Sequence, residues 1–118
     1  MEHDFNLREY LYNDVSIKKK EHKLLKTYLE CKVAQCNKNN LTDLEYEDCK
    51  RDCAESLITF AKMKRELYFD FTEYNYKSLF DCSKLPGTEG ETCRDKVMRS
   101  IPERAKQVRD FLKNEFNI

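Results

Sequence analysis

The sequence has few residues that interrupt regular structure. Its 118 residues include only two prolines and two glycines, so few positions favour a turn. Neither charge is in excess, because 22 basic residues balance 22 acidic ones. A protein that binds nucleic acid through its phosphates needs a basic excess, so we expect no nucleic-acid partner. The scarcity of turn residues predicts long uninterrupted elements.

Long apolar runs are also missing. No stretch approaches the roughly 18 apolar residues of a membrane-spanning helix. The first residues, MEHDFNLREY, lack the basic and apolar regions of a signal peptide and the Arg/Ser-rich composition of a transit peptide. We therefore expect no transmembrane segment and no cleaved targeting sequence. A chain of this length predicts a single domain, covering residues 1–118.

Apolar side chains recur at helical spacing along most of the chain. Helix starts are predicted at Asn6 and Ser16, and the asparagines of residues 37–42 predict the first turn. Thr42 and Glu45 form a capping-box pattern, and no proline or glycine follows before Leu85. This stretch predicts one long amphipathic helix, either straight or bent. Residues 68–76 also alternate partly like a strand, but no partner strand is apparent.

The segment LPGTEGE, residues 85–91, is the clearest turn in the sequence. After it, Thr92 and Asp95 predict the cap of another helix, and Pro102 predicts a kink or a second start within that helix. The fold class is therefore all-α. We predict antiparallel hairpins of three to four helices, with one long central helix and turns near residues 37–42 and 85–92.

The spacing of the six cysteines favours disulfides between antiparallel helices. Within one helix Cys31 and Cys36 are separated by about 7.5 Å of rise, which exceeds the usual Cα separation of a disulfide. Along a second helix, Cys49 and Cys53 span about 6 Å, so two antiparallel helices bring the pairs into register. The remaining two cysteines flank the second turn. The predicted disulfides are Cys36–Cys49, Cys31–Cys53 and Cys82–Cys93.

Two other roles suit the cysteines less well. A zinc knuckle needs a tight turn between its ligands, and neither CKVAQC nor CKRDC contains glycine or proline. A redox catalyst uses a CxxC motif at a helix start, and the sequence has no such motif. We therefore expect no metal ligands, no cofactor and no catalytic residues, and thus a protein that is not an enzyme.

A disulfide-stapled helical hairpin without a signal peptide resembles the cysteine-motif (CHCH and twin CX3C) proteins of the mitochondrial intermembrane space. Residues 49–93 resemble the PDSW accessory subunit of respiratory complex I, with a cysteine pair, a long helix and two further cysteines. Residues 24–67 resemble the small Tim chaperones. Cys49 and Cys53 match their CX3C motif, whereas Cys31 and Cys36 lie one residue further apart.

The resemblance implies a location in the intermembrane space, peripheral to the inner membrane. The expected function is an accessory subunit of a respiratory-chain complex, of the complex I type, whose partners are other protein subunits and not further copies of itself. The alternative is a small-Tim-like chaperone for membrane-protein import.

A cluster of aromatic residues supplies the candidate interface. Tyr and Phe are enriched in the buried centres of protein contacts. The alternative role of such a cluster is packing between neighbouring helices. The candidates are Tyr68, Phe69, Phe71, Tyr74, Tyr76 and Phe80.

Overall fold

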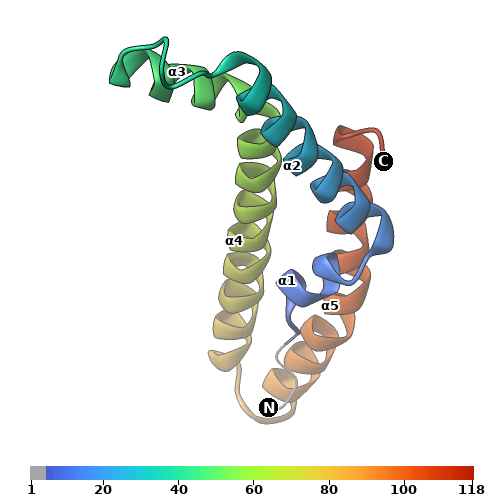
Figure 1. The fold of residues 1–118 in the computed structure, drawn as a ribbon. Helices are drawn as coiled ribbons and strands as arrows, with labels where there is room; N and C mark the ends of the chain where they lie inside the picture. The colour runs from blue at the N-terminus through green and yellow to red at the C-terminus, as the bar shows by residue number, and fades with distance from the viewer. Residues whose placement is uncertain (1–4) are drawn as a thin grey trace.

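The computed structural model describes residues 5–118, and all of its regular elements are helices, as predicted. The five helices are α1 (Leu7–Tyr12), α2 (Val15–Gln35), α3 (Asp43–Cys53), α4 (Glu55–Ser83) and α5 (Gly87–Glu115) (Figure 1). The fold is elongated, with extents of 70 × 28 × 23 Å. Its radius of gyration of 20.1 Å exceeds the roughly 13–14 Å of a compact domain of this length.

The helices α1 and α3 are capped at the predicted residues, Asn6 and Thr42, whereas α2 starts at Val15, with Asp14 rather than the predicted Ser16 as its cap. The side chain of Asn6 accepts a hydrogen bond from the Glu9 amide at the start of α1. Asp14 does the same for the amide of Ile17 at the start of α2. Thr42 and Glu45 form the predicted capping box of α3. Each side chain satisfies backbone N–H groups that have no partner within the first turn of a helix.

The predicted long helix is divided in two. The α3 helix ends at Cys53, and α4 starts after Ala54, whose φ of −90° and ψ of −1° depart from helical values. Alanine favours helices, so the break does not come from the residue itself. Both disulfides of the first hairpin hold α3 on α2, whereas Phe60 of α4 is buried among other helices. Figure 1 shows α3 leaning away from the axis of α4.

The predicted cap at Thr92 is wrong. The α5 helix begins five residues earlier, at Gly87, after Pro86 in an extended conformation. Gly87 has a φ of +50°, which favours glycine, and a Cβ atom on Gly90 would lie 2.8 Å from the carbonyl oxygen of Leu85. The two glycines therefore allow a tighter turn than the sequence predicts. The helix also continues through Pro102 without a second start.

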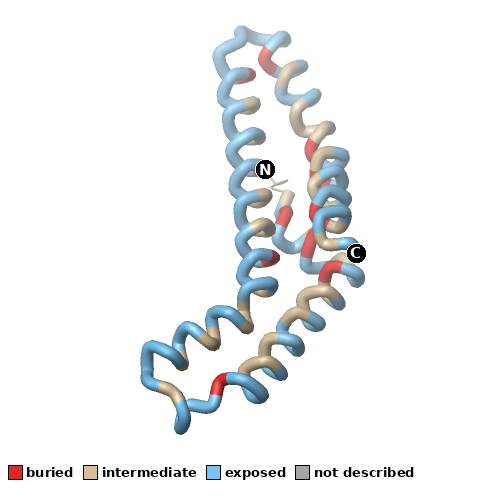
Figure 2. Tube along the Cα trace, turned by 90° about the horizontal axis from the view of Figure 1, so that it is seen from above, coloured by how far each residue is buried: buried red, intermediate tan, exposed pale blue. Residues whose placement is uncertain are grey.

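The apolar core lies where α1 fits between α4 and α5 (Figure 1). Figure 2 shows most of the buried positions in this part of the molecule, with a few at the α4–α5 turn and one at the end of α2, while the tip formed by α2 and α3 is mostly exposed. No residue of α3 is buried. The core consists of Leu7, Leu11, Ile17, Phe60, Phe71, Ile101, Ala105 and Leu112.

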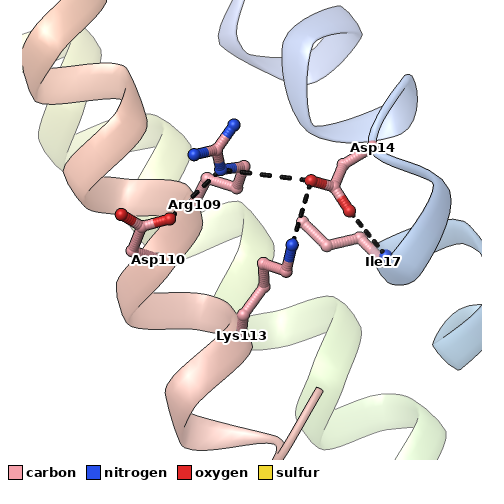
Figure 3. A network of polar contacts seen from close by, with 5 residues as sticks. All are labelled: Asp14, Ile17, Arg109, Asp110 and Lys113. Atoms are coloured by element: carbon pink, nitrogen blue, oxygen red, sulfur yellow. Dashed lines mark hydrogen bonds and ion pairs between the residues drawn. The ribbon is translucent and has the colours of Figure 1, made fainter.

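Asp14 joins the start of α2 to the end of α5 (Figure 3). One of its carboxylate oxygens accepts from the Ile17 amide at 3.0 Å, while the other lies 3.3 Å from the Lys113 ammonium and 4.0 Å from the Arg109 guanidinium. Partial burial opposes ionisation, but the hydrogen bond from Ile17 and the charge of Lys113 outweigh it. The pKa of Asp14 therefore lies below its ordinary value.

This network predicts that the stability depends on pH. Because folding lowers the pKa of Asp14, the carboxylate stabilises the fold above its unfolded pKa of about 3.9, and the contribution is lost as pH falls through the folded pKa. We expect Asp14→Ala to cost roughly 1–2 kcal/mol at pH 7 by removing the cap. Asp14→Asn, which keeps the capping oxygen, should cost less. Denaturation of each variant between pH 2 and 7 measures these differences.

The difference between wild type and Asp14→Asn should shrink as the pH approaches 2. A difference that stays constant across the range would show that the charge of Asp14 does not stabilise the fold.

Candidate interaction surface

The three disulfides form as predicted. Two of them join α2 to α3, with Cα–Cα distances of 5.6 Å for Cys31–Cys53 and 5.7 Å for Cys36–Cys49. We call these the outer and inner rungs. The third, Cys82–Cys93, joins the end of α4 to the start of α5 at 5.4 Å. Cys36 lies just past the last turn of α2 with non-helical φ and ψ, as its five-residue spacing requires. All six cysteines lie within residues 5–118, and none of them is free.

The rungs also bear on the zinc alternative. The Sγ atoms of Cys36, Cys49 and Cys53 lie within 4.8 Å of one another, a spacing that suits metal ligands. Each sulfur is bonded to a partner cysteine, however, and zinc binds the thiolate form. In this oxidised state the cluster is a pair of structural cross-links.

Two of the six candidate aromatic residues pack inward. The side chain of Phe71 is only 5% exposed and belongs to the core, with its ring centroid 6.1 Å from that of Phe5. Tyr68 is half-buried against the core, and the guanidinium of Arg8 lies 4.1 Å from the centre of its ring. These two residues hold the N-terminal part of the chain against α4, as in the packing alternative.

Three of the other candidates share the outward face of α4. Phe69, Tyr76 and Phe80 are 58%, 76% and 57% exposed. They are separated by seven and four residues, which places them on one side of a helix. Ile58, 51% exposed, lies eleven residues before Phe69 and continues the same line by three helical turns. We call Ile58, Phe69, Tyr76 and Phe80 the outer stripe of α4.

Ile58 was not among the predicted interface residues, although its spacing from Phe69 is visible in the sequence. Its eleven-residue distance from Phe69 equals the distance from Phe69 to Phe80. The outer stripe therefore extends about 33 Å along the helix, at 1.5 Å per residue. The exposed charged residues Lys62, Arg65 and Glu73 lie between its members on the same side of the helix, so the stripe is a row of separate apolar side chains in which only Tyr76 and Phe80 are one turn apart.

Tyr74 faces a different neighbour. Its ring lies 4.5 Å from the Arg104 guanidinium of α5, and its side chain is 58% exposed. The ring lines a shallow groove of about 400 Å³ between α4 and α5, together with Leu67, Phe71 and Phe111. Burial lowers the pKa of Arg104, although the nearby Tyr74 opposes that shift. Tyr74 thus lies on a second, smaller apolar surface.

A further hollow of about 600 Å³ lies between α1 and α4. The sequence did not reveal it, because it depends on where α1 packs. Two of the cations that line it are engaged in holding helices together. Arg8 stacks on Tyr68, and the Lys64 ammonium lies 2.6 Å from the Glu21 carboxylate of α2. The lining residues are Arg8, Glu9, Leu11, Tyr12, Ala61, Lys64, Arg65 and Tyr68.

No known protein family, curated protein or solved structure matches this chain. No helix in residues 5–118 is both long enough and apolar enough to cross a bilayer.

The inward and outward aromatic residues should differ sharply in their effect on stability. Phe71→Ala leaves a cavity in the core, so we expect a loss of about 3–5 kcal/mol. Phe69→Ala removes an exposed ring from the same helix and should change stability by no more than about 0.5 kcal/mol. Urea denaturation of both variants measures the contrast. Similar losses would mean that the two faces of α4 are wrongly assigned.

The two hairpins should depend differently on their disulfides. Because α3 contributes no buried residue, the rungs replace a core there. We expect Cys36→Ser/Cys49→Ser to increase amide exchange in α3 at least about tenfold, since an inner loop of this length contributes about 3 kcal/mol. The matched variant Cys82→Ser/Cys93→Ser should leave α3 unchanged. Hydrogen exchange that remains slow in α3 without the inner rung would contradict this role.

Proposed function

We propose that this protein is a non-enzymatic accessory subunit of a mitochondrial respiratory-chain complex, of the complex I type. It would lie on the intermembrane-space side of the inner membrane, peripheral to the bilayer. The observation that carries the proposal is the outer stripe of α4, four exposed large apolar side chains in one line. When a partner covers such side chains, the complex is stabilised by about 25 cal/mol for each Å² of apolar area buried.

Three disulfides in a chain of 118 residues support the proposed compartment. Disulfides persist in oxidising environments and are rare in the cytosol. The resemblance to cysteine-motif proteins of the intermembrane space indicates which oxidising compartment the protein would occupy. An oxidising compartment and a row of exposed apolar side chains together fit a subunit of an assembly.

The shape of the molecule supports a structural role. It is a rod 70 Å long, cross-linked at the tip and at the second turn. A pre-organised surface loses little conformational entropy when it binds, which favours stable docking. The rod would lie along the assembly with the outer stripe against neighbouring subunits.

The second candidate is a small-Tim-like chaperone, and α2 carries the observation that favours it. Leu25, Leu29 and Val33 are spaced four residues apart and are 43%, 48% and 85% exposed. They form an apolar line on the same hairpin that resembles the small Tims. A chaperone would offer such a line to precursors of membrane proteins, and would release them again.

The native size of the protein in gently solubilised mitochondria separates the two candidates. We expect the tagged wild-type chain to migrate with a respiratory complex, and Phe69→Asp/Phe80→Asp to migrate as the free protein. Val33→Asp, which places a charge on an even more exposed apolar site of α2, is the control and should remain in the complex. Native gel electrophoresis followed by immunoblotting gives the result.

Other outcomes would overturn the proposal. A small soluble ring that Val33→Asp disrupts would establish the chaperone. Absence of the wild-type protein from mitochondria would remove both candidates.

A further inference from the structure

The two rungs of the α2–α3 hairpin bring together sulfur atoms that are not bonded to each other. The Sγ atom of Cys36 lies 3.9 Å from the Sγ atom of Cys53, although they belong to different disulfides. Cys49 completes a group of three sulfurs within 4.8 Å of one another, and Cys31 stands outside this group. Disulfides rearrange when a thiolate attacks a neighbouring disulfide sulfur, so this spacing places an attacking atom next to its target.

The sulfurs differ in their access to solvent. A groove of about 360 Å³ is lined by Cys31, Cys49 and Cys53. Cys36 does not line this groove, and it is only 7% exposed. A thiol from solvent can therefore reach Cys31, Cys49 or Cys53, while Cys36 is open to attack from its neighbours within the hairpin.

We infer that Cys36, Cys49 and Cys53 form a thiol–disulfide exchange site, in which opening of either rung by a small thiol leads to a Cys36–Cys53 disulfide. This inference does not depend on the proposed function. The outer rung gives the first route. A thiolate bonds to the Sγ atom of Cys31, and Cys53 leaves as a thiolate. Cys53 then bonds to Cys36, the Cys36–Cys49 bond breaks, and Cys49 leaves as a thiolate that takes a proton from water.

The inner rung gives a second route to the same disulfide. A thiolate bonds to Cys49, and Cys36 leaves as a thiolate next to Cys53. Cys36 then bonds to Cys53, and Cys31 leaves as the thiolate. In both routes the second step forms one disulfide and breaks one, so it needs no oxidant. The hairpin can therefore interchange its cross-links after a single attack from solvent.

The charge around the groove selects the attacking thiol. Glu45, Asp48 and Asp52 line it beside the sulfurs. Arg51 pairs with Asp48 at 3.1 Å and offsets part of this charge. The carboxylates repel an approaching anion, and added salt weakens that repulsion. The co-substrate class is therefore a cationic or neutral thiol, and glutathione, whose other groups carry net negative charge, is disfavoured.

A pair of single variants tests the exchange directly. In Cys31→Ser the free thiol is Cys53, which lies beside Cys36. In the matched control Cys53→Ser the free thiol is Cys31, which stands outside the three-sulfur group. The purified variants are incubated at pH 8, labelled with an alkylating reagent and mapped by mass spectrometry, and circular dichroism checks that the helices are retained.

We expect Cys31→Ser to carry label on both Cys49 and Cys53. A share of at least about one tenth on Cys49 corresponds to a difference of no more than about 1.4 kcal/mol between the two disulfides. Cys53→Ser should carry label on Cys31 alone. Label confined to Cys53 in the first variant, at every incubation time, would overturn the inference.

The wild-type protein provides a test that needs no substitution. Limiting cysteamine, a cationic thiol, is added, and the reaction is quenched with acid and mapped. We expect a species that contains the new Cys36–Cys53 disulfide, and we expect it to form faster with cysteamine than with glutathione at equal thiolate concentration. Partial reduction that yields only the native pairs with both reagents would contradict the exchange site.

Discussion

The attachment of α3 to α2 by two disulfides is the constraint on which the rest of the structure depends. The rungs fix α3 along α2, while α4 must turn to bury Phe60 in the core. The chain meets both requirements by breaking the helix at Ala54, directly after Cys53. The direction in which α4 leaves this break decides which of its faces is buried. One face carries Phe60 and Phe71, and the opposite face carries the outer stripe.

The apolar core and the α2–α3 tip are stabilised by different means. Around α1 the core residues exclude water, and the Asp14 network adds a charged link between α2 and α5. The tip has no comparable core, so its order depends on covalent links that restrict the unfolded chain. A link that holds the tip is also a link that thiols can open. Because sulfurs of the two rungs also lie close to each other, the disulfides that hold the hairpin can exchange with one another.

The sequence predicted the features that local chemistry decides. The capping side chains at Asn6 and Thr42, the all-α class and the three disulfides follow from spacing along the chain and from the geometry of helices. The break at Ala54 could not be predicted, because it arises from a conflict between the rungs and the core rather than from Ala54 itself. The division of the aromatic residues between core and surface also depends on where α1 packs. The start of α5 depends on close contact between Gly90 and Leu85, which spacing alone does not show.

Mapping the disulfides of the native protein, purified under acid without reducing agent, tests the account most directly. We predict Cys31–Cys53 and Cys36–Cys49 as the dominant links of the hairpin, and no thiol open to alkylation. Free thiols at these four positions, or a dominant link within α2 or within α3, would contradict the account. The geometry of the tip, the break before α4 and the exposure of the outer stripe would then all need another cause.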